Sequence, residues 1–505
     1  MIELDGKSLT IEHLRRIADG EKIRISETAI GKVKASREIV EKLVSEDRVV
    51  YGITTGFGHL CNTRISRGDL QRLQTNLIRS HATGVGEPFT RDEVRAMIAI
   101  RINSLLHGVS GVRVEAISAL ADLLNHDVIP RVPQQGSVGS SGDLAPLSHI
   151  MLVLMGEGEV LEKNGARQPA ESALKKAGLT PICLQAKEGL ALINGTSVMS
   201  GVLALAVDRG LCLAKSADIV AGLTLEVLKG STSPFDPDFI ALRPYSGMKQ
   251  VAANVLACLQ DSQLRASHLD CSKIQDAYSL RCVPQVHGAT RETLNHLTNQ
   301  VTIEINSVTD NPILLSSEKI ISGGHFHGQP MALAADFFGI AISELANISE
   351  RRVDRLLNPL VSGMSPFLAT DPGVNSGLMI VQYTAASLVS ENKVLAHPAS
   401  VDSIPTSAYQ EDHVSMGTIA ARKGAQILSN AMQVLAIEWV CAAQAYESAK
   451  PLALGKGTQH AYELLRKNIP PLLEDRILAP DLELAKQLIW KGELLHHVSQ
   501  FVEIS

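Results

Sequence analysis

A loop rich in glycine and serine spans Gly136 to His149, reads GSVGSSGDLAPLSH, and has neither helical nor strand periodicity. Because glycine has no Cβ, it allows positive φ and lets an amide nitrogen come unusually close to a carbonyl carbon. A ring can then close if the nitrogen of Gly142 attacks the carbonyl carbon of Ser140. Loss of two waters, one of them from the Ser141 hydroxyl, leaves an exocyclic methylene. We therefore expect this loop to make an electrophile from its own backbone.

Other interpretations of the loop differ in strength. A glycine-serine turn without chemistry stays open on these residues alone, because short motifs often occur by chance. The nucleophile elbow requires Gly-x-Ser-x-Gly, which Gly139-Ser140-Ser141-Gly142 does not match. A phosphate-binding loop would end in Gly-Lys-Ser/Thr, and this loop has no such ending.

Three polar side chains elsewhere stand where helices meet loops. Apolar residues at helical spacing predict a helix from Ser26 to about Glu46, after which Tyr51 begins the glycine-rich stretch YGITTGFG. A phenol there can be presented to a cavity, although an ordinary boundary tyrosine is the alternative. His81 closes an apolar helical end and either contacts a substrate or lies at the surface. Asn194 is a helix cap or a polar group that points at the reaction centre.

The segment QDAYSLRC carries an amide, a phenol and a guanidinium, from Gln275, Tyr278 and Arg281. A guanidinium is the natural bidentate partner of a substrate carboxylate. The segment QEDH, from Gln410 to His413, places two carboxylates before a long helix. Structural ion pairing is the alternative for both segments.

A metal site is suggested only by the pair His325-x-His327. Neither a carboxylate nor a cysteine stands at ligand spacing from this pair, so we expect no metal.

The composition describes a globular chain with a small-molecule partner. Of its 505 residues, 45% are hydrophobic, 20% charged and 4% aromatic, and the net charge is only -6. Nothing therefore suggests nucleic acid or an anionic membrane. The first twenty residues lack the apolar core of a signal peptide, and the seven cysteines form no CxxC pair. We expect core thiols in a reducing cytoplasm and no membrane span.

Long helices dominate the second half of the sequence. Apolar periodicity predicts helices from Met331 to Leu357, from about Asn375 to Ala396, and from Gly417 to Glu447, the last about 45 Å long. Earlier, Thr90 to Glu93 forms a capping box before an apolar helix. The long helices carry more apolar surface than one monomer buries, which indicates a homo-oligomer. We expect an N-terminal domain at 1–200 and a helical bundle at 201–505.

Ten motifs in order resemble the aromatic amino acid ammonia-lyases over nearly the whole chain, and within that family the histidine enzymes of bacteria most closely. They are YGITTGFG, NLIRSHATGVG, GSVGSSGDLAPLSH, EGLALINGT, QDAYSLRC, SVTDNP, SGGHFHGQP, GVNSGLM, SENK and SIPTSAYQEDHVSM. The likeness implies a mainly helical homotetramer with a central bundle of long helices. It also implies active sites that are each assembled from three subunits.

The resemblance assigns a role to each matching position. Ser140, Ser141 and Gly142 would form a methylidene-imidazolone group, MIO, with no external cofactor. Tyr51 would remove the β-proton, Asn194 and Tyr278 would hold the MIO and the substrate, and Arg281 would bind its carboxylate. The expected surroundings of the substrate are Gln275, Phe326, His81, Met379, Gln410 and Glu411. Elimination needs a base, an electrophile and a cation, and Tyr51, the MIO and Arg281 are one of each.

Three positions depart from the family pattern: Ser140 where alanine is usual, and His325 and Tyr409 where asparagine is usual. Serine should be tolerated at 140, because only its carbonyl takes part in ring closure. The expected reaction is loss of ammonia from L-histidine to give trans-urocanate. The alternatives are a lyase or 2,3-aminomutase of tyrosine or phenylalanine, and a catalytically silent relative that serves as a scaffold.

Overall fold

The computed structural model describes residues 1–269 and 274–505, so the predicted core thiol Cys271 lies outside the described residues. The chain divides into two compact units. We call the first the pocket unit (Met1–Asp208, Thr298–Asp336 and Pro398–Lys423) and the second the bundle unit (Arg209–Leu297, Phe337–His397 and Gly424–Ser505). Each unit thus draws on three stretches of sequence. The predicted division into domains at residue 200 stays a prediction.

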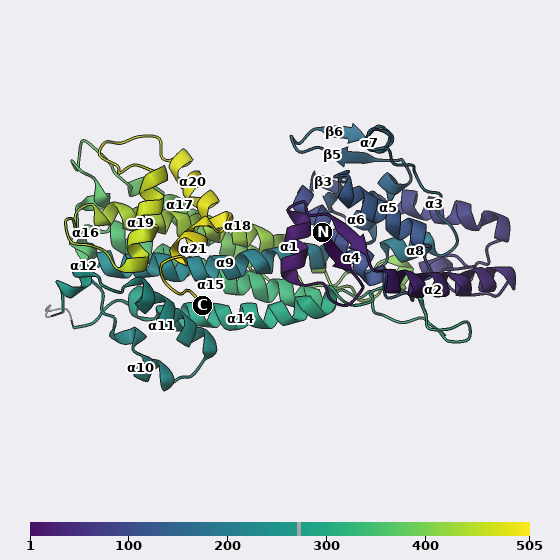
Figure 1. Ribbon diagram of the computed structural model, residues 1–505, viewed down its shortest axis with the longest axis horizontal. Helices are drawn as coiled ribbons and strands as arrows, with labels where there is room; N and C mark the ends of the chain where they lie inside the picture. The colour runs from purple at the N-terminus through teal and green to yellow at the C-terminus, as the bar shows by residue number, and fades with distance from the viewer. Residues whose placement is uncertain (270–273) are drawn as a thin grey trace. The chain divides into compact units, whose positions relative to one another are not determined.

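The chain is mainly helical, as predicted, and its strands pair only in twos (Figure 1). In the pocket unit, helices are α1 (Ile11–Ala18), α2 (Glu27–Ser45), α3 (Leu70–His81), α4 (Arg91–Leu105), α5 (Val114–Asn125), α6 (Leu144–Leu154), α7 (Ala170–Ala177) and α8 (Glu188–Ile193). The paired strands are β1 (Ile2–Leu4) with β2 (Ile23–Ile25), β3 (Val85–Pro88) with β4 (Pro133–Gln135), β5 (Glu159–Leu161) with β6 (Arg167–Pro169), and β7 (Ile313–Leu314) with β8 (Ile320–Ile321). Only the first pair is parallel.

Helix α4 is the core of the pocket unit, and every residue from Val94 to Leu105 is buried. The predicted capping box at its start is confirmed: Thr90 N donates to Glu93 Oε2 at 2.9 Å, and the Thr90 side chain accepts from the backbone three residues on. Helix α4 packs against α1 and α5. A fully buried helix of this kind fixes the frame on which the shorter helices lie.

Helices α3, α6 and α8 pack against one another, α3 and α8 each touching α6. Each ends or begins at a residue singled out in the sequence. His81 is the last residue of α3, α6 follows the glycine-serine loop directly, and Asn194 caps the C-terminus of α8. Three packed helices therefore bring together segments that are far apart in the sequence.

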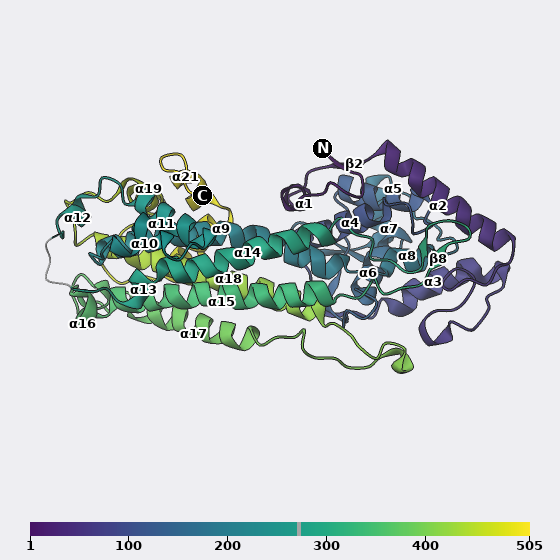
Figure 2. The same cartoon turned by 90° about the horizontal axis from the view of Figure 1, so that it is seen from below.

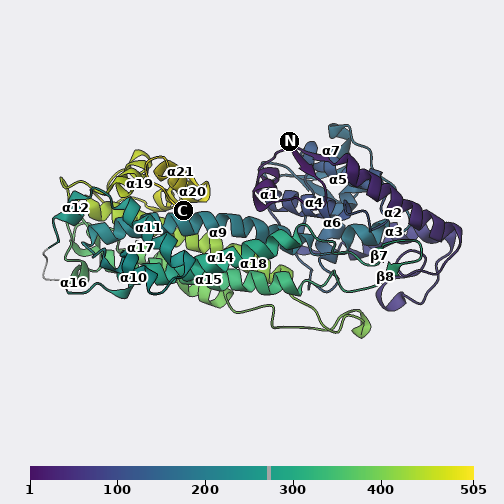
Figure 3. The same cartoon turned by 60° about the horizontal axis from the view of Figure 1, so that its bottom comes forward.

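The bundle unit is built on long helices that run side by side in the views of Figures 2 and 3. They are α9 (Ser197–Val227), α14 (Val283–Glu304), α15 (Gln329–Leu357) and α18 (Gly417–Tyr446), whose other ends belong to the pocket unit. The shorter helices are α10 (Pro237–Ala241), α11 (Ser246–Cys258), α12 (Gln263–Ala266), α13 (Tyr278–Arg281), α16 (Pro359–Ser362), α17 (Met379–Leu395), α19 (Lys456–Asn468), α20 (Ala479–Trp490) and α21 (Glu493–Val498).

The predicted long helices are confirmed as α15, α17 and α18. Helix α17 begins four residues later than expected, at Met379. The reason is local, because Gly373 and Gly377 adopt φ of +106° and +61° and keep the backbone out of the helical region.

A charged pair, Arg352 and Glu438, lies fully buried between α15 and α18. Arg352 donates to both carboxylate oxygens of Glu438, at 2.6 and 2.8 Å, and Thr224 and Ser349 donate to the same oxygens at 2.7 and 2.6 Å. Every acceptor of the carboxylate is thus used, which is the condition for a buried charge to be tolerated.

Two of the long helices are strongly apolar and are largely buried. Within the described residues, α9 and α15 are long and apolar enough to cross a membrane, but 78% and 61% of their most apolar windows are buried inside the molecule, as in core helices.

The prediction that the cysteines are mostly core thiols is wrong for four of the six that the structure describes. Only Cys258 and Cys441 are buried, because the others lie on loops or at the edges of helices.

Candidate active site

A cavity of about 890 Å³ opens in the pocket unit, where six segments converge. Its walls come from the segment after Tyr51, the end of α3, the glycine-serine loop, the end of α8, and the segments before α15 and α18. Polar residues on this wall are Tyr51, Ser80, His81, Ser140, Ser141, Asn194, Asn311, Ser322, His327, Ser407, Gln410, Glu411, Asp412 and His413. All of them belong to the pocket unit.

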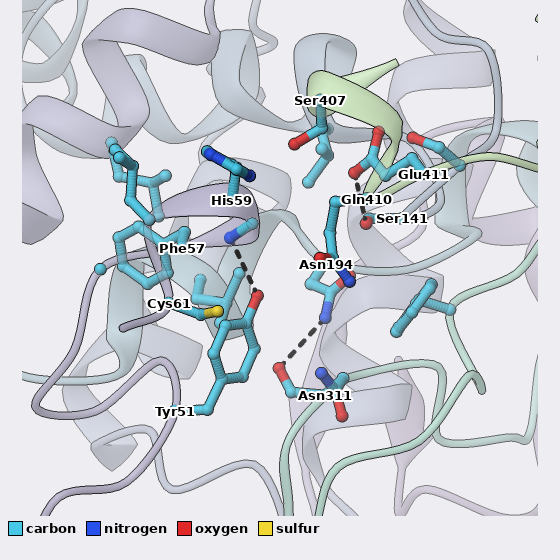
Figure 4. Close-up of a pocket in the computed structure, with 18 of the residues that line it drawn as sticks. Tyr51, Phe57, His59, Cys61, Ser141, Asn194, Asn311, Ser407, Gln410 and Glu411 are labelled. Atoms are coloured by element: carbon cyan, nitrogen blue, oxygen red, sulfur yellow. Dashed lines mark hydrogen bonds between the residues drawn. The ribbon is translucent and has the colours of Figure 1, made fainter. Parts of the chain in front are cut away.

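Eight residues predicted from the sequence line this one cavity. They are Tyr51, His81, Ser140, Ser141, Asn194, Phe326, Gln410 and Glu411. Gly142 borders a smaller cavity of about 210 Å³ that shares Ser140 with the first. Figure 4 shows Tyr51 at the lower left and Glu411 at the upper right, with Asn194 and Gln410 between them.

Tyr51 is half-buried in a turn that the chain fixes with its own hydroxyl groups. Thr54 Oγ1 donates to the carbonyl of Arg48 at 2.7 Å and accepts from Val50 N at 2.9 Å. The Tyr51 hydroxyl accepts from Gly58 N at 3.3 Å. Burial raises the pKa of this phenol, and the nearby Cys61 and Glu411 raise it further. The turn therefore holds a phenol whose conjugate base is stronger than that of free tyrosine.

The glycine-serine loop is pressed against the turn after α8. Gly142 has φ of +70°, and a Cβ at this position would lie 2.1 Å from the carbonyl oxygen of Gly195. Gly195 N donates to the Ser141 carbonyl at 3.2 Å, and Asp143 N donates to the Gly195 carbonyl at 2.8 Å. Only glycine fits at 142, because both the conformation and the contact exclude a side chain.

Asp143 anchors the other end of this loop and is fully buried. One carboxylate oxygen accepts from Val198 N at 2.9 Å and Met199 N at 3.0 Å, at the N-terminus of α9. The other accepts from Ser137 Oγ at 3.1 Å and from the Thr418 hydroxyl. Burial raises the pKa of this carboxyl, while the hydrogen bonds it accepts oppose the rise. Asp143 therefore ties the loop to the start of α9 and to the start of α18.

Glu411 joins the loop to the far wall of the cavity. Ser141 Oγ donates to Glu411 Oε1 at 3.1 Å, and Thr406 Oγ1 donates to Glu411 Oε2 at 2.6 Å (Figure 4). In the chain between Thr406 and Glu411, the residues Ser407, Ala408 and Tyr409 have φ of +51°, +52° and +66°. Three consecutive left-handed residues without glycine are costly, at about 1–2 kcal/mol each. The backbone thus stores strain where it presents a carboxylate to the loop.

His81 lies at the C-terminus of α3, with Nδ1 at 3.0 Å from the Ser80 hydroxyl. Burial lowers the pKa of this imidazole, and the charge of Glu411 opposes the shift. A neutral ring can both donate and accept a hydrogen bond.

Four predicted residues belong to the bundle unit and line neither cavity: Gln275, Tyr278, Arg281 and Met379. Tyr278 is 70% exposed, and the Arg281 guanidinium lies over its ring, 4.6 Å from the centroid. Arg281 Nε is buried without a partner among the described residues. The pair is a pre-formed cation and phenol that lacks an anion.

The three departures differ in their position. Ser140 is 7% exposed and lines the cavity, so its hydroxyl stands beside the reacting backbone. His325 and Tyr409 are exposed and lie outside the cavity wall. Their side chains therefore do not shape this cavity directly.

Several wall residues were given no role in the site from the sequence. Asn311 lies in the motif SVTDNP, and His327 and His413 stack with ring centroids 5.5 Å apart. Cys61 lies beside the phenol of Tyr51 in Figure 4. The motif that holds Asn311 was visible in the sequence, but only the fold shows that its asparagine faces a cavity.

The loop fits a group made from residues 140–142. Positive φ at Gly142 favours ring closure, and its φ is +70°. In addition, Asn194 Oδ1 is a buried acceptor without a partner among the described residues. An acceptor of this kind is expected beside a group that completes the site.

Comparison with known proteins gives a consistent result over the whole chain. A sequence model described as aromatic amino acid lyase matches residues 9–467. Histidine ammonia-lyase of Alkaliphilus oremlandii is 49% identical over 100% of this chain and 99% of its own length. The crystal structure of histidine ammonia-lyase from Trypanosoma cruzi superposes with a TM-score of 0.92 at 42% identity, covering 99% of this chain and 95% of that one. Tyrosine aminomutase from Streptomyces globisporus gives 0.94 at 39% identity, covering 100% and 99%.

Proposed function

The chain belongs to the aromatic amino acid lyase family, and from that premise we propose that it eliminates ammonia from L-histidine to give trans-urocanate. The observation that supports this best is that Tyr51, Ser141, His81 and Glu411 all line one cavity. A carbon-nitrogen lyase needs a base and an electrophile there, and an imidazole substrate needs polar partners.

Ser140, Ser141 and Gly142 would form the MIO, which supplies the electrophile that makes the substrate amine a leaving group. Tyr51 acts as the base for the β-proton; burial raises the pKa of its phenol, so the phenolate is a strong base but a minor form near neutral pH. Asn194 holds the loop side of the cavity. Arg281 binds the substrate carboxylate, for which its half-buried guanidinium is suited, and the exposed Tyr278 holds the MIO and the substrate.

We further propose a homotetramer in which each site draws residues from three subunits. Helix α15 exposes Leu333, Phe337 and Ile340, which are 39%, 46% and 47% accessible. A contiguous apolar face on a long helix suits burial against another copy. A shared site would also explain why Tyr278 and Arg281 do not line the cavity that holds Tyr51 and Ser141. The six described cysteines are free, which fits the reducing cytoplasm.

The polar side chains that line the cavity favour histidine over the rival substrates. An imidazole has two ring nitrogens that need partners once buried, whereas phenyl has none and phenol has one hydroxyl. His81 and Glu411 offer both a donor and an acceptor. Ring closure removes the Ser141 hydroxyl, so a phenyl ring would leave Glu411 Oε1 without a donor, and we expect about 10⁴-fold discrimination against phenylalanine.

Tyrosine is the stronger rival, because its hydroxyl offers His81 a polar partner that a phenyl ring lacks, and the superposed tyrosine aminomutase is 39% identical to this chain. Purified protein incubated with histidine, tyrosine and phenylalanine, followed by product identification and kcat/KM for each, decides between lyase and mutase and between substrates. A preference for tyrosine would overturn the proposed role of His81 and Glu411.

A separate measurement tests whether the chain is a catalytically silent member of the family. Intact mass of the purified chain should fall short of the encoded mass by two waters, and Ser141→Ala should abolish the deficit and the turnover together. Wild-type protein of full mass without turnover would support a scaffold role instead.

A further inference from the structure

Behind Asn194 lies a buried ion pair that the proposed chemistry does not use. Lys187 Nζ donates to Asp310 Oδ2 at 2.8 Å, and both side chains are completely buried. Burial lowers the pKa of Lys187, while Asp310 opposes the shift. All these residues belong to the pocket unit.

The same carboxylate touches the Asn194 side chain. Asn194 Nδ2 donates to Asp310 Oδ1 at 3.4 Å and to the Asn311 carbonyl at 3.1 Å (Figure 4). Asp310 Oδ1 and the Asn311 carbonyl are both acceptors, so only the NH₂ end of the amide can face them. The network therefore fixes which end of the Asn194 amide is which.

The other end of the amide is left free. Asn194 Oδ1 is buried and has no partner among the described residues. In Figure 4 the amide lies between Asn311 and Ser141. The Asn194 backbone is held as well, because Arg101 donates to its carbonyl at 2.7 Å. A rigid amide thus keeps an unpaired acceptor at the loop side of the cavity.

We propose that Asp310, held by Lys187, is a positioning residue that locks the Asn194 amide with its oxygen toward the Ser141–Gly142 loop. The inference rests on the proposed function, since it concerns the loop from which the MIO would form. Asp310 and Lys187 act through Asn194 and do not touch the reacting atoms. The essential feature is the acceptor oxygen at 310, and the charge of the ion pair serves to hold that oxygen in place.

Two double variants separate positioning from stability. Lys187→Met/Asp310→Asn and Lys187→Met/Asp310→Leu both remove the ion pair and keep similar volumes. They differ because asparagine still offers an oxygen to Asn194 Nδ2, whereas leucine offers none. Circular dichroism and melting temperature establish that both are folded.

The positioning role predicts that the leucine double variant loses turnover by about 10- to 100-fold relative to the asparagine double variant, the scale on which outer partners of an active group matter. Its KM should stay within about threefold, and its two-water mass deficit should be incomplete. A merely structural ion pair predicts equal turnover and equal mass deficit for the two, which would overturn the proposal.

The single variant Asp310→Asn gives a second test if the leucine chain does not fold. With Lys187 present, the new amide must turn its oxygen to the ammonium and its NH₂ toward Asn194. Turnover should then be about tenfold lower than in Lys187→Met/Asp310→Asn, although fewer residues are changed. Equal turnover in these two chains would also overturn the proposal. Wild-type protein without turnover or mass deficit would instead count against the proposed function itself.

Discussion

The pocket unit and the bundle unit bury polar groups in different ways. In the bundle, Arg352 and Glu438 satisfy each other between regular helices, and hydroxyl groups complete the carboxylate. In the pocket unit, polar side chains mostly hold backbone: Asp143 accepts from two amides of α9, and Tyr51 accepts from Gly58 N. The bundle therefore gains stability from a closed network, whereas the pocket unit uses its polar groups to fix loops.

Unpaired buried atoms and left-handed residues occur in both units, but in the pocket unit they border the cavity. Asn194 Oδ1 is left without a partner, and Ser407 to Tyr409 adopt left-handed conformations beside the cavity. Such costs persist only where the surroundings enforce them, and they concentrate at functional sites. Changes among the cavity residues should then affect catalysis first, and changes in the buried Arg352–Glu438 network of the bundle should affect stability first.

The largest effect is expected for Gly142→Ala. The new Cβ would lie 2.1 Å from the Gly195 carbonyl oxygen in a left-handed residue, so the loop cannot keep its shape. We expect turnover below detection and no two-water mass deficit. Gly178→Ala is the matched control, because Gly178 has φ of +71° but nothing within 4 Å of its Cβ position. It should cost about 1 kcal/mol of strain and leave turnover unchanged. Equal effects of the two substitutions would show that the contact with Gly195 is unimportant.

Arg352→Met tests the bundle. It leaves the fully buried Glu438 without its cation, which destabilises proteins by about 3–5 kcal/mol. The melting temperature should fall, and the two-water mass deficit should persist, since the loop belongs to the other unit. Arg352→Met/Glu438→Leu should recover much of the loss, because no charge then stays unpaired. A single variant that melts like wild type would contradict the closed network.

Tyr51→Phe should lower turnover by about a hundredfold, the scale of losing a general base, with fold and mass deficit kept. Tyr446→Phe in the bundle is the matched control: its hydroxyl donates to the Leu452 carbonyl at 2.9 Å, so its loss should cost about 1 kcal/mol of stability and no turnover. Steady-state kinetics and melting curves of both variants check the contrast. Near-normal turnover of Tyr51→Phe would assign proton removal to another group.

The same contrast explains what could be predicted from the sequence. Helical periodicity and the capping box gave α4, α15, α17 and α18, because these signals are local. The apolar character of α15 was also visible, yet Phe337 is 46% accessible in the single chain, because periodicity does not say which apolar residues a neighbour covers. The convergence of Tyr51, Ser141 and Glu411 rests on contacts between distant segments, which no local pattern encodes. Resemblance named those residues, but Asn311 and the Lys187–Asp310 pair became visible only in the fold.

The smallest expected effect is the pH dependence carried by His149. Its Nε2 accepts from Gly84 N at 3.0 Å, and burial, together with the charge of Arg131, lowers its pKa from the usual 6.5. As the pH falls below 6.5, the unfolded chain takes up a proton before the folded chain does, so stability present above this pH is lost progressively. Each unit of pKa difference corresponds to about 1.4 kcal/mol.

His149→Gln keeps an acceptor for Gly84 N but does not titrate. The fall in melting temperature between pH 7.5 and pH 5.5 should therefore be smaller in this variant by about 1–2 °C, measured at one protein concentration. Some pH dependence will remain, because burial also lowers the pKa of His81 and His287. His126→Gln, at an exposed position after α5, serves as the control and should leave the pH dependence as it is. If His149→Gln and wild type lose the same number of degrees, the folded chain does not hold this histidine in its neutral form, and the hydrogen bond from Gly84 does not anchor the start of β3 to α6.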